Sequence, residues 1–163
     1  MKFPRPLFYI LAFAFSFSLF LAGCRNNPKT VKLFFVELYR PDQKFTKEYI
    51  KETGCDDHLV GIDRPIGPSD DPLTSALNQL FSAKENLPQG LYNSLSLSDL
   101  KLDRIDTQDG RTSIYLKGSY QLGGSCDDPR FVDQIKETVS QFSKITNPLI
   151  FIDGRSLEEF LEK

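Results

Sequence analysis

Residues 71–81 read DPLTSALNQLF, and this segment is the clearest helix in the sequence. Asp71 is of a residue type that caps helix N-termini, and Pro72 suits the first helical position because the N–H it lacks would have no partner there. The apolar residues of the segment are Leu73, Ala76, Leu77, Leu80 and Phe81. Their spacing of three and four residues predicts a single apolar stripe that faces a core.

A second helix is predicted by the same device near residue 128. Asp128-Pro129 opens it and Asn147-Pro148 closes it. Its stripe is formed by Phe131, Ile135, Val139 and Phe142, with Val132 beside them. We therefore expect two amphipathic helices that each bury one face.

Strands are predicted on either side of these helices. Residues 31–38 (VKLFFVEL) are apolar on both faces, which indicates a central or covered strand. Residues 58–66 (HLVGIDRPI) read as a second strand that ends near Pro65. A short apolar strand is predicted over residues 149–152, ended by Asp153-Gly154.

A β-hairpin is predicted between the two helices. Residues 100–107 and 112–120 flank Asp109-Gly110, a dipeptide typical of tight hairpin turns. Leu100 and Leu102 share a parity that Ile105 breaks, so a β-bulge is expected there.

These elements predict the α+β class, in the order β-β-α-β-β-α-β. The simplest arrangement is a mixed sheet with two amphipathic helices packed on one face and a short C-terminal helix over residues 156–162. Residues 39–54, with one helical turn near 47–51, and residues 84–96 are predicted loops.

The N-terminus has the pattern of an export signal. Lys2 and Arg5 precede an uncharged apolar run over residues 6–22, which ends in Leu21-Ala22-Gly23-Cys24. This ending resembles the lipobox of bacterial lipoproteins. The alternative is an uncleaved transmembrane helix, but the run is slightly short for the roughly 20 residues that span a bilayer.

The lipobox resemblance implies cleavage of a signal peptide, residues 1–23, and lipid on the Cys24 thiol. A diacylglycerol and usually a further acyl chain such as palmitate would hold the protein on a membrane, through a short tether at residues 24–30. We expect a location in the cell envelope, anchored on the extracytoplasmic side. The sequence leaves open which membrane carries it.

Composition limits what the remaining chain does. Removal of 23 of the 163 residues leaves 140, enough for one domain, residues 31–163. Without the two basic residues of the signal, the formal charge changes from −2 to −4. Because no basic cluster is present, we expect no binding to nucleic acid.

Two cysteines remain once Cys24 is lipidated. An even number in an exported domain favours a disulfide between Cys55 and Cys126. Two free thiols, or metal ligation together with His58, stay open as alternatives.

Four aspartates flank these cysteines: Asp56 and Asp57 follow the first, and Asp127 and Asp128 follow the second. A disulfide would bring them together, and carboxylates crowded in this way could bind calcium. The alternative is that Asp128 caps the second helix, Asp127 favours its positive end and the others are solvated. We assign no metal to the protein on this evidence.

No catalytic arrangement is predicted. His58 is the only histidine, and Ser94 and Ser96 lie in no Gly-x-Ser-x-Gly elbow. We therefore expect no enzyme activity, no cofactor and a surface position for His58.

Four segments together resemble the GerMN domain of sporulation and germination lipoproteins. They are residues 72–77 (PLTSAL), 100–116, 134–142 (QIKETVSQF) and 150–154 (IFIDG). The resemblance extends to a subgroup with paired cysteines, here Cys55 and Cys126. It implies a compact α+β fold and protein–protein scaffolding rather than catalysis. Germination is not implied, since only one such domain is found.

Two functions follow from these observations. The first is a membrane-anchored interaction module that binds an unidentified envelope protein. The alternative is a small envelope enzyme or ligand-binding protein with a pocket between loops 39–54 and 84–96, lined by Tyr92. An exposed apolar patch would favour the first function, and a deep pocket the second.

Overall fold

The computed structural model describes residues 29–42, 44–45, 48–85, 87–88, 90–142, 145 and 147–162. The predicted signal peptide and Cys24 lie outside these residues. The strands are β1 (Lys29–Glu37), β2 (Lys51–Thr53), β3 (Asp57–Ile66), β4 (Leu91–Tyr92), β5 (Asp99–Gln108), β6 (Arg111–Ser119), β7 (Leu149–Ile152) and β8 (Arg155–Ser156). The helices are α2 (Pro72–Ser82), α3 (Asp127–Ser140) and α4 (Leu157–Leu161), with 3-10 turns η2 (Gly54–Asp56) and η3 (Ser94–Leu97).

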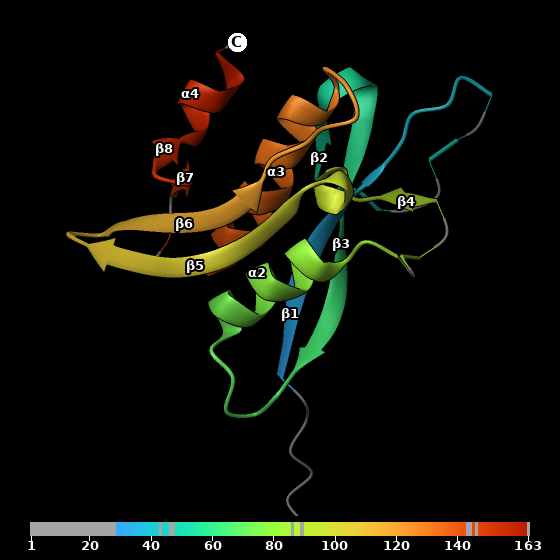
Figure 1. The fold of residues 1–163 in the computed structure, drawn as a ribbon. Coiled ribbons are helices and arrows are strands. Elements are labelled where there is room, and N and C mark those ends of the chain that lie inside the picture. The colour runs from blue at the N-terminus through green and yellow to red at the C-terminus, as the bar shows by residue number, and fades with distance from the viewer. Residues whose placement is uncertain are drawn as a thin grey trace, which may run out of the picture.

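The strands form two sheets of four, as Figure 1 shows. The first has the order β2-β3-β1-β4 and is antiparallel. The second has the order β5-β6-β7-β8, in which β6 and β7 are parallel. The α+β class and the predicted succession of the main elements are confirmed, and the strands are divided between two sheets. Helix α2 contacts both β1 and β5, so one hydrophobic core joins the sheets.

Helix α2 begins as the sequence predicts. The Asp71 side chain accepts the N–H of Thr74, and Pro72 is the first helical residue. The residues buried in the core are Ala76, Leu77, Leu80 and Phe81. The predicted stripe therefore holds the helix between the two sheets.

Helix α3 begins two residues earlier than predicted. It starts at Asp127 with Cys126 as N-cap, so Asp128 is not the cap, and it ends at Ser140. Phe131, Ile135 and Val139 are buried as expected. Two polar residues, Gln134 and Thr138, are also buried, which the apolar pattern did not predict.

Polar side chains of α3 cover one edge of β1. Strand β4 pairs with β1 only at Val36 and Glu37, so among the described residues no strand lies beside the edge at Lys32 and Phe34. Gln141 accepts the N–H of Lys32 and donates to its carbonyl, both at 2.8 Å. The N–H of Phe34 bonds the Thr138 hydroxyl at 3.3 Å, and its carbonyl accepts from Gln134 at 2.8 Å. The helix thus supplies the hydrogen bonds that a strand would otherwise provide.

Gln134 also connects this edge to the turn η3. Its Oε1 accepts the backbone N–H of Ser94 at 2.9 Å and the Ser94 hydroxyl, and its Nε2 donates to Oδ1 of Asn93 at 3.1 Å. All three side chains are buried. This network fixes η3 and β4 against α3.

The two predicted loops contain short regular elements. Residues 39–54 include β2, and residues 84–96 include β4 and the start of η3. The helical turn expected near 47–51 is wrong at its end, because Lys51 begins β2. The hairpin has the predicted bulge, a register shift between Leu102 and Arg104. Strand β1 starts at Lys29, so the last two residues of the predicted tether belong to it.

Strand β1 runs along β3 over the length of the first sheet (Figure 1). Lys29 pairs with Ile66 at the lower end of that view, and Glu37 pairs with His58 at the upper end. In the part of the chain that the structure describes, no helix is long and apolar enough to span a bilayer.

Candidate functional site

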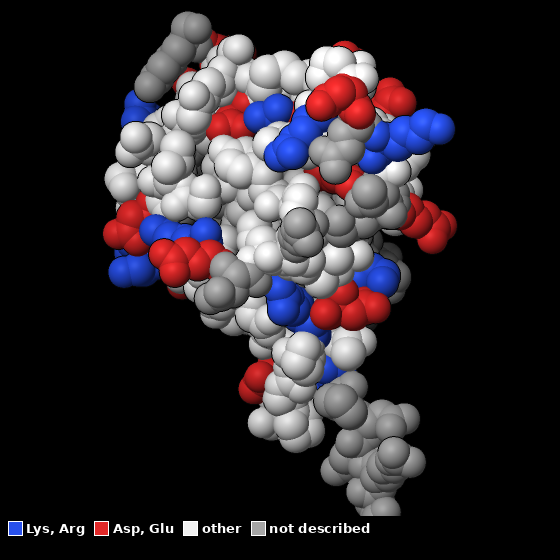
Figure 2. All heavy atoms as spheres, turned by 90° about the vertical axis from the view of Figure 1, so that its right-hand side faces the viewer, with Lys and Arg blue, Asp and Glu red and all other residues white. Residues whose placement is uncertain are grey.

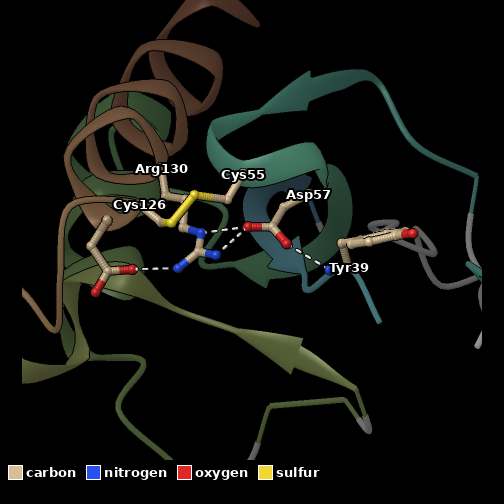
Figure 3. The surroundings of a disulfide bond; sticks show 6 residues. Tyr39, Cys55, Asp57, Cys126 and Arg130 are labelled. Atoms are coloured by element: carbon tan, nitrogen blue, oxygen red, sulfur yellow. Dashed lines mark hydrogen bonds and ion pairs between the residues drawn. A yellow bond between two sulfur atoms is a disulfide. The ribbon is translucent and has the colours of Figure 1, made fainter. Parts of the chain in front are cut away.

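A disulfide joins η2 to the start of α3. The Cys55 and Cys126 sulfurs are bonded, and their Cα atoms lie 5.7 Å apart (Figure 3). The sequence separation is 71 residues, so the bridge links two distant parts of the chain. It lies at the upper end of β1, away from Lys29.

The turn that carries Cys55 is held in an unusual backbone conformation. Cys55 and Asp56 have φ values of 62° and 61°, a region that L-residues rarely adopt. Gly54 precedes them because there is no room for a side chain: a Cβ there would lie 2.2 Å from Cγ of Pro129. The turn is therefore pressed closely against the first turn of α3.

Arg130 lies between two buried carboxylates near the bridge (Figure 3). Its Nε donates to Asp57 at 2.6 Å, where Nη2 also makes contact, and its Nη1 donates to Asp127 at 2.8 Å. Burial acts to lower the pKa of Arg130, but hydrogen bonds to Asp127 and Asp57 outweigh it and raise this pKa. The guanidinium therefore stays charged and neutralises much of the negative charge around the disulfide.

The four aspartates of the calcium hypothesis do not come together as one group of carboxylates. Asp57 and Asp127 come together but share Arg130, Asp56 is exposed, and Asp128 accepts a 3.4 Å hydrogen bond from Tyr120. Over the described ranges no group of three or more His, Cys, Asp or Glu side chains could hold a metal ion. The repulsion between carboxylates, on which the hypothesis depended, is relieved by Arg130.

A shallow hollow, which we call the disulfide hollow, lies over the bridge. Its lining includes Tyr39, Cys55, Tyr92, Gly124, Cys126 and Arg130. Tyr39 belongs to the 39–54 segment and Tyr92 to the 84–96 segment, so a depression exists where the sequence predicted a pocket. It is open rather than deep, since Tyr39 is 48% exposed at its rim.

The polar groups of the disulfide hollow are occupied by one another. Asp127 accepts the Tyr92 hydroxyl at 2.9 Å and the N–H of Gly123 at 2.8 Å. Asp57 accepts the backbone N–H of Tyr39 at 2.5 Å. Burial, followed by the hydrogen bond to Asp127, raises the pKa of Tyr92 to about 12, so its hydroxyl stays protonated. These groups stabilise the local structure rather than await a substrate.

Exposed apolar side chains gather beside the hollow. We call Tyr39, Phe45, Tyr49 and His58, whose rings lie against one another in a chain of contacts, the aromatic cluster. Tyr39, Tyr49 and Ile50 are 48%, 46% and 56% exposed, and they are three of the five exposed large apolar side chains in the described residues. Figure 2, which looks at the molecule from the right of Figure 1, shows uncharged atoms over much of this side, interrupted by Lys, Arg, Asp and Glu side chains.

His58 occupies a different place from the surface position predicted. Phe45 stacks on its ring at a centroid distance of 3.4 Å and Tyr49 at 3.8 Å. Nδ1 of His58 is buried without a hydrogen-bond partner among the described residues. No described Ser or acid is hydrogen-bonded to Nδ1, and the two stacked rings make His58 an aromatic support for the cluster.

Sequence reasoning missed Arg130 and Phe45. A signal for Arg130 exists, because it follows Asp127 by three residues and so lies on the same helix face. No local pattern marks Phe45, which lies in an irregular segment and meets His58 only through the fold.

Comparisons with known proteins agree with this fold. The profile of a family described as Germane, sporulation and spore germination, matches residues 34–158. The tandem GerMN domains of the sporulation protein GerM from Bacillus subtilis match with a TM-score of 0.56 and 16% identity, over 83% of this chain and 43% of that chain. The first GerMN domain of that protein matches with a TM-score of 0.55 and 19% identity, over 80% of this chain and 86% of that one.

The resemblance to GerMN domains predicted from the sequence is thereby confirmed. The chain spans less than half of the tandem structure and most of the single domain. At these identities the likeness concerns the fold. No curated protein matches the chain significantly.

Proposed function

Because the chain belongs to the Germane family of sporulation and spore germination domains, we propose that it is a lipid-anchored interaction module of the cell envelope. In this proposal the domain binds another envelope protein and catalyses no reaction. The observation that carries it is the aromatic cluster, in which the rings of Tyr39 and Tyr49 are exposed, with the exposed side chain of Ile50 next in sequence. Surfaces of this kind mark sites of protein contact.

The environment of the polar groups favours binding over catalysis. Tyr92 is held protonated, and Asp57 and Asp127 are both engaged by Arg130. A general base must be free to accept a proton from a substrate. The carboxylates near the hollow therefore suit a structural role.

The anchor and the aromatic cluster would lie at opposite ends of the domain. Lipid on Cys24 would hold Lys29 within about 17 Å of the attachment point, the greatest reach of the intervening chain. Strand β1 then extends about 27 Å toward the cluster, at about 3.4 Å per residue. The partner would accordingly meet the domain away from the bilayer surface.

Photo-crosslinking in cells tests the docking surface. A photoreactive amino acid at Tyr49 is expected to capture a specific envelope protein, and the same residue at Leu149, which is 41% exposed on the second sheet, is not. The Tyr39→Ser substitution should lower capture at position 49. Equal capture at both positions, or capture that Tyr39→Ser leaves unchanged, contradicts the assignment.

The anchor is tested separately by mass and by location. The mature protein should begin at Cys24 and carry the mass of a diacylglycerol, and the Cys24→Ser variant should leave the membrane fraction. If that variant remains membrane-bound and correctly processed, the lipoprotein assignment is wrong.

A second candidate function is ligand binding in the disulfide hollow. It is favoured by the position of the hollow between Tyr39 and Tyr92, on the two segments expected to form a pocket. A fragment screen that shifts the amide resonances of Gly123 and Gly124 would support it. A screen without such shifts would leave protein docking as the function.

A further inference from the structure

The two cysteines of the bridge differ in exposure to solvent. Cys55 is an exposed residue and Cys126 is half-buried. Both line the disulfide hollow, which is open to solvent. Thiol–disulfide exchange requires an attacking thiolate to reach one sulfur in line with the S–S bond, so access favours Cys55 as the point of attack.

The position of Cys126 favours its departure as the leaving group. It is the N-cap of α3, a helix of 14 residues, and no side chain caps that end. The positive end of a helix stabilises a thiolate. The nearby carboxylates of Asp57 and Asp127 share Arg130, and Asp128 accepts from Tyr120, so the acids of this region are partly compensated.

The closed bridge is associated with an unfavourable backbone conformation in the turn at Cys55. Opening the bridge allows this conformation to change. Cys55 and Asp56 both have positive φ, which is unfavourable for residues with a side chain. The bridge and the contact of Gly54 with Pro129 hold them there. Once the bridge opens, the turn can relax without unfolding the core.

We propose that the Cys55–Cys126 bridge is an exchange site for an extracytoplasmic dithiol oxidoreductase, and that its opening loosens the segment bearing the aromatic cluster. This inference rests on the docking function proposed above and adds that the redox state of the bridge regulates docking. Asp57, two residues after Cys55, bonds the backbone of Tyr39, so the turn is linked to the first residue of the cluster. Figure 3 shows the bridge, Asp57 and Tyr39 in this succession.

The reaction proceeds in two balanced steps. A thiolate of the oxidoreductase attacks Sγ of Cys55, and the electron pair of the broken S–S bond leaves on Cys126. The second thiol of the oxidoreductase then attacks the first oxidoreductase sulfur, which is bonded to Cys55 in the mixed disulfide. This step releases Cys55 as a thiol. The bridge gains two electrons and two protons, and the oxidoreductase dithiol becomes a disulfide.

Trapping the mixed disulfide tests the point of attack on the folded, oxidised protein. The probe is a thioredoxin whose resolving cysteine has been replaced, and the adduct is mapped by peptide mass spectrometry without reduction. Adducts on Cys55 should exceed those on Cys126 by tenfold or more. Adducts mainly on Cys126, or reaction only after the domain is unfolded, overturn the proposal.

A pair of glycine substitutions tests the contribution of the turn. Asp56→Gly relieves one positive φ, so the bridge should need about threefold more dithiothreitol for half-reduction. Asp109→Gly relieves a φ of 50° in the hairpin turn, far from the bridge, and should change nothing. Equal behaviour of the two variants contradicts the proposed role of the turn.

Hydrogen exchange tests the consequence for the docking segment. On reduction, amides of residues 48–56 should exchange at least fivefold faster, while those of Ile114 and Leu116 in the core should not change. Equally faster exchange at all of these amides would mean global unfolding and would contradict the proposed regulation of docking by the bridge. Crosslinking at Tyr49 and sulfur exchange are read independently, so the docking function and this proposal can fail separately.

Discussion

Gln134 and Gln141 bond the same edge of β1 in different surroundings. Gln134 is fully buried and serves Phe34, Ser94 and Asn93, whereas Gln141 is exposed and serves Lys32 alone on this edge. A buried group left without a partner costs about 1–3 kcal/mol, because water cannot replace the lost bond. The two residues therefore form a matched pair for measuring what burial adds to one type of hydrogen bond.

The Gln134→Leu substitution should lower the free energy of unfolding by about 3 kcal/mol or more, since it strands the Phe34 carbonyl and the Ser94 N–H. The Gln141→Leu substitution should cost about 1 kcal/mol or less. Urea unfolding followed by circular dichroism measures both. Losses of equal size would show that water reaches the Gln134 site.

Single residues were the least predictable part of the site. The number of cysteines and the predicted export signal favoured a pair between Cys55 and Cys126 over free thiols or metal ligands, and the two sulfurs are bonded in this structure. The role of Gln134 could not be predicted, because a glutamine on a helix is ordinarily solvated and its partner Phe34 lies 100 residues away. The sequence likewise did not predict that the positive charge between Asp57 and Asp127 is the Arg130 guanidinium rather than a calcium ion.

At the scale of elements, the cap of α2 gives stability that depends on pH. The hydrogen bond from the Thr74 N–H lowers the pKa of Asp71 below its ordinary 3.8. The stabilisation that the ionised Asp71 cap gives to the folded state is complete above pH 3.8. It disappears as the pH falls through the lower pKa of the folded state. Asp71→Ala should therefore cost about 1 kcal/mol at neutral pH and little at pH 2.

Asp71→Asn provides the control for this cap. Asparagine retains an oxygen that can accept the Thr74 N–H but does not titrate. Thermal unfolding measured between pH 2 and pH 7 should show near-normal stability at pH 7 and a weaker dependence on acid. If the Asp71→Asn variant shows the same pH dependence of thermal stability as the wild type, titration of Asp71 is not its cause.

The disulfide between η2 and α3 should be a major source of stability. A bridge over a sequence separation of 71 residues contributes about 4 kcal/mol in the chain-entropy model. The Cys55→Ser/Cys126→Ser double variant should lose about this amount in urea unfolding, and the wild-type domain should show no free thiol. A loss below about 1 kcal/mol would mean that Arg130 and its two carboxylates hold the turn alone.

Regular elements with strong local signals were predicted well. The caps and stripes of α2 and the bulged hairpin follow from residues close in sequence, so pattern reasoning finds them. Strands β2 and β4 have only three and two residues and arise from pairing with β3 and β1. The division into two sheets likewise depends on contacts between distant segments, which no local pattern contains.

For the molecule as a whole, the proposed anchor fixes which end faces the bilayer. Ser69 follows β3 next to the Lys29 end, and Glu52 lies on β2 near the aromatic cluster. In lipid vesicles with a headgroup quencher, a fluorophore at Ser69 should be quenched more strongly than one at Glu52. The Cys24→Ser protein should show no quenching at either position, and equal quenching in the lipidated protein would contradict the orientation.

The cover that α3 provides for β1 has a consequence for the order of synthesis. The side chains that seal the strand follow it by 100 to 109 residues. A ribosome adds roughly 5–20 residues per second, so β1 exists for roughly 5–20 seconds before its seal is made. During that interval its open edge can pair with another nascent chain. Pairing of this kind is therefore possible until residues 134–141 of α3 and the segment after it have been translated.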